Sequence, residues 1–284
     1  MNYRNILFKG EYILRKNSIN DASIDAENLL SISLNRTRED ILLNLETNLN
    51  QNEIKSYINL INKRKKKEPI SLITGKRYFW NSEFTINKHV LTPRFETELL
   101  VEEILKIFNK FTNFSILDIG TGSGCILISL LKERKLWRGT GIDISALALK
   151  NAKNNAKIQQ IDNRIKFINS DIDKFYGSKY DLVVSNPPYI SKIGFNNLDL
   201  GVKNFEPKKA LYGGIDGLKI IEKVIKKSKI ILKNNGLLAL EIGKGQSNKV
   251  INLLKNNGFY VSKIVLDYQK IKRCIFARKI NEKF

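Results

Sequence analysis

Hydrophobic and polar positions follow two different periods along this chain of 284 residues. Up to about residue 75 the apolar residues recur at helical spacing, as they do at Ile54, Tyr57, Ile58 and Ile61. From about residue 98 onward, short apolar runs alternate with longer amphipathic segments, which is the pattern of strands alternating with helices. The sequence therefore predicts two architectures, one after the other.

The first part is predicted to be a small helical domain over residues 1–75. Residues 21–34 and 37–45 are predicted to be short helices, the second with Thr37 as its N-cap. Residues 77–92 alternate aromatic and β-branched residues, so a short hairpin or an extended linker is expected within 76–97.

The second part, residues 98–284, is predicted to form a doubly wound α/β sheet. Strands are expected at 115–119, 139–143, 165–168, 180–185, 236–242, 259–266 and 272–278. Helices are expected between them, notably at 124–134, 145–157, 216–233 and 246–257. In such a sheet, ligands bind beyond the carboxyl ends of the strands.

Composition excludes several classes of protein. No window approaches the roughly 18 uninterrupted apolar residues of a spanning helix, and the N-terminus lacks the apolar core of a signal peptide. Cys125 and Cys274 are the only cysteines and His89 is the only histidine, which argues against a disulfide framework and predicts no metal site. We expect a cytoplasmic protein with no membrane partner.

The formal net charge of +21 raises the question of a nucleic-acid partner. Lysines are scattered over the chain, with one dense run from Lys63 to Lys67 at the end of a predicted helix. Cations in a last helical turn complement the helix dipole, so a solvated helix end is favoured over a binding patch. The charge allows a polyanionic or acidic partner without identifying one.

A glycine-rich loop follows the first predicted strand of the sheet, in the stretch ILDIGTGSGC. Gly120, Gly122 and Gly124 let the backbone approach a ligand closely and start a helix behind it. The second strand ends at Asp143, whose carboxylate can accept both hydroxyls of a ribose. Two alternatives stay open: the loop is only a tight turn, or Asp143 only caps the helix that starts near Ser145. Loop and acid together favour a nucleoside cofactor.

The fourth predicted strand leads into DLVVSNPPYISK, residues 181–192. Two prolines stop the strand and stiffen the chain behind it, because proline fixes φ and donates no backbone hydrogen bond. An amide side chain and an aromatic ring flank these prolines at the mouth of the sheet. The alternative is a rigid turn at a sheet edge, but the position downstream of a glycine loop favours a functional motif.

These motifs resemble those of S-adenosylmethionine-dependent methyltransferases that modify a planar nitrogen, with Asp118 before the glycines, Asp143 at the second strand and Asn-Pro-Pro-Tyr after the fourth. The tetrapeptide is similar in amino-methyltransferases of DNA or RNA bases and in glutamine methyltransferases of release factors. The flanks, residues 68–101 and 204–218, resemble the release-factor enzymes of the HemK/PrmC type. The resemblance runs through nearly the whole chain. Phe95 stands where that family usually has proline, and Ile172 where an aromatic residue is often found.

The resemblance implies a Rossmann-like methyltransferase domain and a helical substrate-binding domain. It implies methylation of the glutamine in the Gly-Gly-Gln motif of peptide-chain release factors. The implied cofactor site consists of Gly120, Thr121, Gly122, Ser123, Gly124, Asp143, Asp171, Ile172 and Asn186. The implied catalytic and substrate-binding residues are Asn186, Pro187, Pro188 and Tyr189, of which Pro188 is expected only to contact substrate.

This motif suits an amide substrate. The Asn186 side-chain oxygen and the Pro187 carbonyl are acceptors that can take both N–H bonds of an NH2 group. Tyr189 can pack against the flat amide and exclude water. A nucleic-acid amino-methyltransferase is the alternative, since it shares this mechanism and suits the charge, but no added target-recognition domain is seen. A non-catalytic binding protein on the same fold is the third hypothesis.

Several further residues keep two interpretations. Arg94, Glu96 and Glu98 either line the site or cap the following helix. Glu206 and Pro207 either shape the glutamine pocket or support a loop, and Glu241 is expected to hold neighbouring backbone. His89 is placed in the hairpin without a catalytic role. We expect release factors as partners, no stable nucleic-acid partner, and a monomer.

Overall fold

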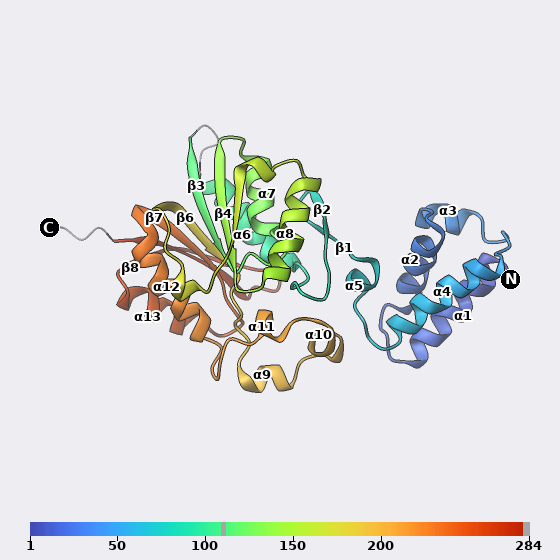
Figure 1. Ribbon diagram of the computed structural model, residues 1–284. Helices are drawn as coiled ribbons and strands as arrows, with labels where there is room; N and C mark the ends of the chain where they lie inside the picture. Colours follow the sequence, from blue (N-terminus) through green and yellow to red (C-terminus); the bar gives the residue numbers. More distant parts are fainter. Residues whose placement is uncertain (109–111, 281–284) are drawn as a thin grey trace. The chain divides into compact units, whose positions relative to one another are not determined.

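The computed structural model describes residues 1–108 and 112–280 (Figure 1). Within them the chain forms two compact units. The first is Met1–Gly75 together with the returning segment Asp199–Phe205, and the second is Lys76–Leu198 with the chain from Glu206 onward. The hydrophobic period of the sequence changes near the same place, whereas no sequence pattern indicated the returning segment.

The first unit is helical. Its helices are α1 (Tyr3–Lys16), α2 (Ala22–Leu34), α3 (Arg38–Leu43), α4 (Gln51–Arg64), α5 (Ile70–Thr74) and α10 (Leu200–Phe205). The apolar faces of α1, α2 and α4 meet in a core that fully buries Ile6, Leu30 and Tyr57. Thr37 Oγ1 accepts a hydrogen bond from the Asp40 N–H at 3.1 Å, which confirms the predicted N-cap of α3.

Within the described residues, the second unit holds a seven-stranded sheet of order β5-β4-β3-β6-β7-β9-β8. Its strands are β3 (Phe114–Ile119), β4 (Trp137–Asp143), β5 (Ile165–Asn169), β6 (Tyr180–Ser185), β7 (Leu232–Glu241), β8 (Phe259–Leu266) and β9 (Lys272–Lys279). The strands from β5 to β7 in this order pair in parallel, and β9 pairs antiparallel with β7 and β8. A separate antiparallel hairpin, β1 (Lys76–Phe79) and β2 (Ser82–Thr85), precedes the sheet.

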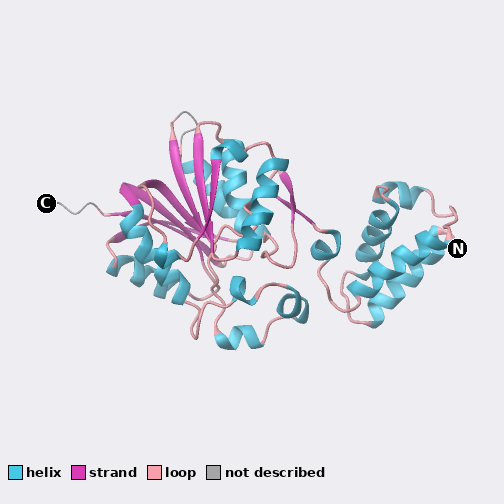
Figure 2. Ribbon diagram, in the orientation of Figure 1, coloured by secondary structure: helices cyan, strands magenta, loops and turns pink. Residues whose placement is uncertain are grey.

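Helices cover both faces of this sheet (Figure 2). One face packs against α6 (Glu98–Ile107), α7 (Cys125–Glu133) and α8 (Ala146–Ile158), and the other against α12 (Lys219–Ile231) and α13 (Ser247–Asn256). Successive strand residues alternate between the two cores, so Leu182 and Val184 belong to the first core and Val183 to the second. The connections contain α9 (Lys192–Asn196), α11 (Lys208–Leu211) and the 3₁₀ turns η1 (Phe95–Thr97), η2 (Asp162–Arg164) and η3 (Ile172–Lys174). The predicted doubly wound α/β sheet is confirmed.

The structure corrects two local predictions. The helix predicted over 216–233 is shorter, because Gly217 has a φ of +80° and the Asp216 carboxylate accepts a hydrogen bond from the Leu218 N–H, which forms a turn before α12. This helix also ends earlier than predicted, at Ile231, because β7 begins at Leu232. The hairpin ends at Thr85, so His89 lies in the loop behind it.

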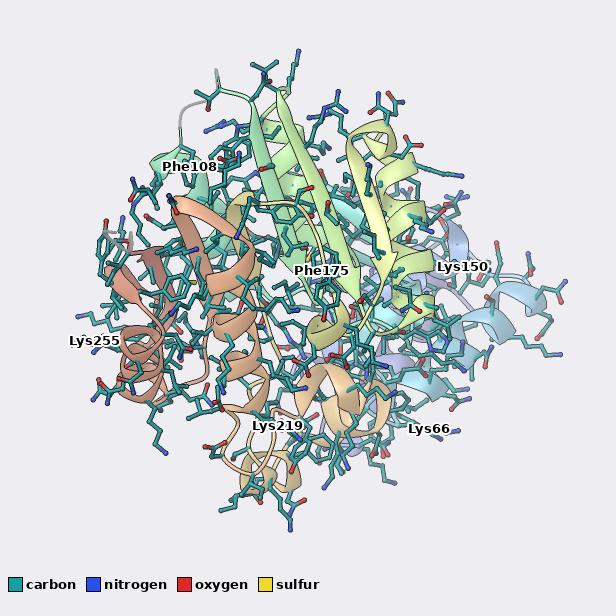
Figure 3. The ribbon with its side chains drawn as sticks, turned by 60° about the vertical axis from the view of Figure 1, so that its left-hand side comes forward. Lys66, Phe108, Lys150, Phe175, Lys219 and Lys255 are labelled. Atoms are coloured by element: carbon teal, nitrogen blue, oxygen red, sulfur yellow. The ribbon has the colours of Figure 1, made fainter. Side chains whose placement is uncertain are left out.

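The surface of the second unit carries basic side chains on separate elements. Lys150, Lys219 and Lys255 are exposed on α8, α12 and α13 (Figure 3). In the part of the chain that the structure describes, no helix combines the length and the apolarity needed to cross a lipid bilayer.

Candidate active site

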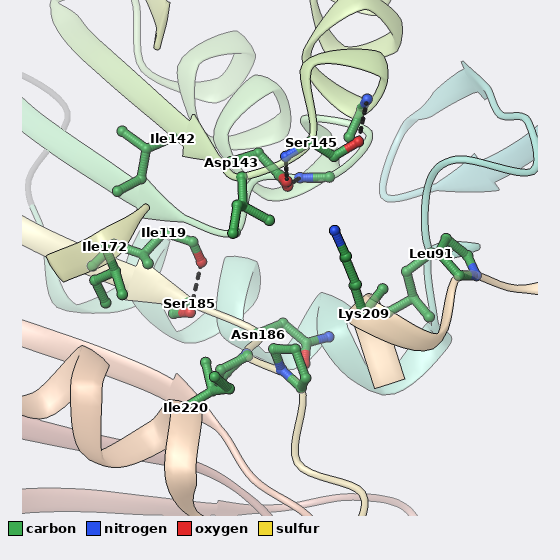
Figure 4. Close-up of a pocket in the computed structure, with 18 of the residues that line it drawn as sticks. Leu91, Ile119, Ile142, Asp143, Ser145, Ile172, Ser185, Asn186, Lys209 and Ile220 are labelled. Carbon is green, nitrogen blue, oxygen red and sulfur yellow. Dashed lines mark hydrogen bonds between the residues drawn. The ribbon is translucent and has the colours of Figure 1, made fainter. Parts of the chain in front are cut away.

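A cavity of about 740 Å³ opens at the carboxyl ends of β3, β4 and β6 (Figure 4). Ile119, Ile142 and Ile172 give it apolar walls, and the loops after β5 and β6 close two of its sides. Residues 207–212 and the start of α12 complete the lining. A parallel sheet creates such a crevice where the connections of adjacent strands leave toward opposite faces, here between β3 and β6.

The glycine loop forms the floor of the cavity between β3 and α7. Gly120 has a φ of +75°, and a Cβ built on it would meet no atom within 4 Å, so its backbone borders open space. Gly124 has a φ of +81°, and a Cβ there would lie 2.9 Å from the Ile128 side chain. The first glycine therefore gives a ligand access to the backbone, while Gly124 lets α7 pack closely.

The carboxylate of Asp143 ties this loop to the end of β4. Its Oδ2 accepts a hydrogen bond from the Gly122 N–H at 3.0 Å, and its Oδ1 accepts one from the Ser145 N–H at 2.8 Å. Burial raises the pKa of Asp143 above its ordinary value. The cap of α8 is the Ser145 hydroxyl, which accepts from the Ala148 N–H at 3.2 Å. Asp143 is therefore part of the cavity wall and not the cap of that helix.

Asp118 lies buried beneath the glycine loop. The Thr121 hydroxyl donates a hydrogen bond to its Oδ2 at 2.7 Å, which fixes the first turn of the loop. Burial raises the pKa of Asp118 to about 7, and the nearby Asp143 adds to this rise. Of the predicted cofactor residues, Thr121, Ser123 and Gly124 lie outside the cavity lining and support the loop from behind. The Ser123 carbonyl, for example, accepts from the side chain of Asn155 at 2.9 Å.

The loop after β5 brings Asp171 and Ile172 to the cavity wall. This loop is held by α12, whose Lys227 is 9% exposed. Its Nζ donates to the Asp173 carbonyl at 3.1 Å and to the Phe175 carbonyl at 2.9 Å. Lys227 of α12 thus helps to position the predicted cofactor residues Asp171 and Ile172, which belong to the loop after β5.

The tetrapeptide after β6 places Asn186, Pro187 and Pro188 at the cavity. The Asn186 Nδ2 donates a hydrogen bond to Thr97 Oγ1 at 3.1 Å. Among the described residues, none donates a hydrogen bond to Asn186 Oδ1 or to the Pro187 carbonyl. Two acceptors at the cavity therefore remain available to an outside donor.

Tyr189 has a different position. It is not among the residues that line the cavity, and its hydroxyl donates to Glu241 Oε1 at 3.2 Å. Its carbonyl accepts from Gln246 Nε2 at 3.0 Å, which anchors the chain behind the tetrapeptide. The stacking of Tyr189 on a substrate amide stays a prediction.

Glu241 was predicted to hold neighbouring backbone, and this prediction was wrong. Its carboxylate bonds two side-chain hydroxyls, those of Tyr189 and of Thr97, the latter at 2.6 Å, and no neighbouring backbone N–H among the described residues. Glu241 is 1% exposed, and burial raises its pKa to about 7. Sequence pattern could not show this, because Thr97 lies far away along the chain.

The structure gives partners to three of the charged residues that had two interpretations, Arg94, Glu98 and Glu206. Arg94 Nη2 forms an ion pair with Glu206 Oε2 at 2.7 Å, and burial raises the pKa of Glu206. Glu98 accepts from the Trp80 N–H at 2.9 Å outside the cavity lining. Pro207 does line the cavity.

Other lining residues were not predicted from the sequence. His89 borders the cavity although no role was assigned to it. Ile220 and Val224 contribute from α12, and their spacing of four residues, which puts them on one helix face, was the available signal. Lys208 and Lys209 come from the short helix α11, which had no clear sequence pattern.

Two family models match the chain: the PrmC N-terminal domain over residues 5–75 and the methyltransferase small domain over residues 95–200. The chain is 38% identical over 267 residues to a release factor glutamine methyltransferase of Caulobacter vibrioides, with 94% of this chain and 92% of the relative covered. It is 36% identical to a release factor glutamine methyltransferase of Clostridium acetobutylicum, over 98% of each chain. This chain belongs to the release factor glutamine methyltransferase family. The family predicted from the motifs is confirmed.

The chain is also similar to part of a longer protein. The chain is 36% identical to a bifunctional methyltransferase of Rickettsia typhi but spans only 55% of that protein's length. Among solved structures, the ribosomal protein L11 methylase from Lactobacillus delbrueckii subsp. bulgaricus is similar with a TM-score of 0.52 at 17% identity, covering 69% of this chain and 84% of that one. This last similarity shows a shared methyltransferase fold.

Proposed function

We propose that this protein transfers a methyl group from S-adenosylmethionine to the side-chain amide nitrogen of the glutamine in the Gly-Gly-Gln motif of peptide-chain release factors. Membership of the release factor glutamine methyltransferase family supports this reaction. The observation on this molecule that carries the proposal is the pair of available acceptors, Asn186 Oδ1 and the Pro187 carbonyl, at the cavity.

The residues of the cavity fit the methyl donor. An ionised carboxylate offers about four acceptor sites, and Asp143 uses two for the backbone N–H groups of Gly122 and Ser145. The remaining sites can accept the ribose hydroxyls. Ile142 and Ile172 offer apolar contact to the adenine. When bound, the cofactor supplies a methyl group on a positively charged sulfur.

The amide nitrogen of glutamine is a poor nucleophile, because its lone pair is delocalised into the carbonyl. Asn186 Oδ1 and the Pro187 carbonyl can accept the two N–H bonds and hold the nitrogen with its lone pair toward the methyl group. Such positioning can contribute about 7–11 kcal/mol to the reduction of the barrier. A strong base is not needed before transfer, because the methylated nitrogen is positively charged and acidic and releases its proton to solvent water afterwards.

The same acceptors make the site selective for an NH2 group. A buried polar group left without its hydrogen bond costs about 1–3 kcal/mol. A substrate without two N–H bonds leaves Asn186 or Pro187 unpaired and therefore binds less tightly in the transition state.

The deciding experiment follows a radiolabelled methyl group from S-adenosylmethionine into purified release factor, with duplex DNA and RNA as parallel acceptors. We expect label on the release factor and its loss when the glutamine of the Gly-Gly-Gln motif is changed. Label on nucleic acid alone would mean that the protein is an amino-methyltransferase of bases.

Replacement of Asn186 by Ala tests the acceptor itself. We expect Asn186→Ala to lower kcat about 100-fold or more, the order of loss typical for one polar contact in the transition state. Binding of S-adenosylmethionine, measured by calorimetry, is expected to stay close to that of the wild type. Equal losses of transfer and of cofactor binding would show that Asn186 serves the cofactor and not the substrate amide.

The proposal also covers the role of the helical unit, the location of the protein and its oligomeric state. The helical unit, residues 1–75 in the sequence-based division, contacts the release factor. The protein acts as a cytoplasmic monomer without a stable nucleic-acid partner.

A further inference from the structure

Behind Asn186, polar side chains are linked by a continuous series of hydrogen bonds. Asn186 Nδ2 donates to Thr97 Oγ1 at 3.1 Å, and Thr97 Oγ1 donates to Glu241 Oε2 at 2.6 Å. The Tyr189 hydroxyl donates to the other carboxylate oxygen at 3.2 Å. Thr97 is 2% exposed and Glu241 is 1% exposed, so water does not compete for these bonds.

In this series of hydrogen bonds the donors and acceptors follow one order, from Asn186 through Thr97 to Glu241. Above its pKa of about 7 the Glu241 carboxylate is ionised and only accepts hydrogen bonds, and a threonine hydroxyl has a single proton to donate. The Thr97 hydroxyl donates its single hydrogen bond to Glu241, so its oxygen can only accept a further hydrogen bond. The group that faces this oxygen must therefore be a donor. The NH2 end of Asn186 therefore turns toward Thr97, and Oδ1 remains for the substrate.

We propose that Glu241, acting through Thr97, is a positioning residue that fixes which end of the Asn186 amide meets the substrate nitrogen. This role rests on the proposed function and deepens it, because it names the group that makes the site selective for an NH2 donor. The two ends of a carboxamide are nearly equal in shape, so packing alone does not choose between them. A reversed Asn186 presents its own NH2 to the substrate NH2, and two donors form no hydrogen bond.

The position of Glu241 suits this role. It is the last residue of β7, the strand next to β6, and the tetrapeptide follows directly from β6. One carboxylate thus holds both ends of the tetrapeptide, Tyr189 directly and Asn186 through Thr97. Thr97 reaches it from η1, the 3₁₀ turn before α6.

The test replaces Glu241 by a side chain of the same shape without the fixed direction. In Glu241→Gln the amide can donate an N–H to Thr97, which then can donate to Asn186 and allow the reversed arrangement. We expect kcat for methylation of release factor to fall about tenfold, the equivalent of one lost hydrogen bond, with the KM for S-adenosylmethionine nearly unchanged. Thermal unfolding of each variant checks that it folds.

Two further variants and a control separate positioning from a structural role. Thr97→Val removes the relay and is expected to lose activity as Glu241→Gln does, while Thr97→Ser keeps the hydroxyl and is expected to retain it. Glu103→Gln changes another buried carboxylate, which pairs with Lys106 and Lys263 outside the cavity, and is expected to leave transfer unchanged.

The outcomes are distinct. If the wild-type protein methylates release factor and Glu241→Gln does so with the same kcat, the positioning role is overturned and the proposed function stands. If Glu241→Gln does not fold, equal activity of Thr97→Val and Thr97→Ser overturns it instead. If the wild-type protein transfers no methyl group to release factor, the proposed function fails and the positioning role fails with it.

Discussion

Glu241 has an unusual electrostatic environment for a carboxyl group. Burial raises its pKa to about 7, while hydrogen bonds from Thr97 and Tyr189 and the charge of Arg273 act in the opposite direction. The charge of Glu96 adds a smaller rise. The same carboxylate that orients Asn186 therefore carries a cost in folding free energy when it is ionised.

This cost predicts a pH-dependent stability at the residue scale. In the unfolded chain Glu241 ionises near the ordinary glutamate pKa of 4.5, so between that pH and about 7 the folded state holds the extra proton. The free energy of unfolding contributed by this group falls as pH rises through that window. We expect the stability of Glu241→Gln relative to the wild type to increase from about pH 5 to about pH 8.

Urea denaturation at the two pH values measures this difference. The Glu103→Gln variant is the control, because ion pairs with Lys106 and Lys263 lower the pKa of Glu103 despite its desolvation. Glu103 is therefore ionised in both the folded and the unfolded state between these two pH values, and the relative stability of Glu103→Gln is expected to stay nearly constant. A relative stability of Glu241→Gln that stays constant or decreases with rising pH would contradict the raised pKa.

At the scale of elements, α12 supports the cofactor side of the cavity through Lys227. This lysine is buried and holds the carbonyls of Asp173 and Phe175, and the loop that it holds carries Asp171 and Ile172. Without the ammonium group, two buried carbonyls lose their donor, and the ion pair of Lys223 with the Asp173 side chain remains as a polar contact between the loop and the helix.

We therefore expect Lys227→Met to weaken the binding of S-adenosylmethionine several-fold, while kcat at saturating cofactor changes less. Calorimetric titration and steady-state kinetics measure the two effects. Lys226→Met is the matched control on the same helix, because Lys226 is exposed and, among the described residues, forms its ion pair with Glu222 one turn away. If both lysine variants bind the cofactor equally well, the loop does not depend on Lys227.

At the scale of the whole molecule, the net charge of +21 predicts attraction to polyanions without a defined binding site. In the second unit, the exposed side chains of Lys150, Lys219 and Lys255 lie on three different helices, α8, α12 and α13 (Figure 3). Binding of this kind depends on the release of counterions and falls steeply with salt, by about 10³–10⁵ between 50 and 200 mM for six to ten phosphate contacts.

We expect duplex DNA to bind weakly at about 50 mM salt, to dissociate at about 200 mM and to receive no methyl group. Fluorescence anisotropy with a labelled duplex follows the binding, and the radiolabel assay follows transfer. DNA binding that persists at the higher salt together with label on the bases would favour the nucleic-acid alternative.

Local signals in the sequence determined the elements and the order of the motifs. Hydrophobic period distinguishes helices from strands, and the glycines, Asp143 and the paired prolines mark strand ends, because these residue types act on the backbone beside them. The family, the sheet and the cavity-lining positions of Gly120, Asp171 and Asn186 could therefore be predicted. The helix predicted at α12 was too long at both ends, because a turn and a following strand compete with the helical pattern.

Only the tertiary structure decided which side chains meet. Asn186, Thr97 and Glu241 come from three separate elements, and the sheet order that places β7 beside β6 brings them together. The return of Asp199–Phe205 to the helical unit is equally non-local. Hydrogen bonds between distant side chains depend on strand order and burial and leave no periodic signal along the chain, so the sequence shows the tetrapeptide and the fold shows what orients it.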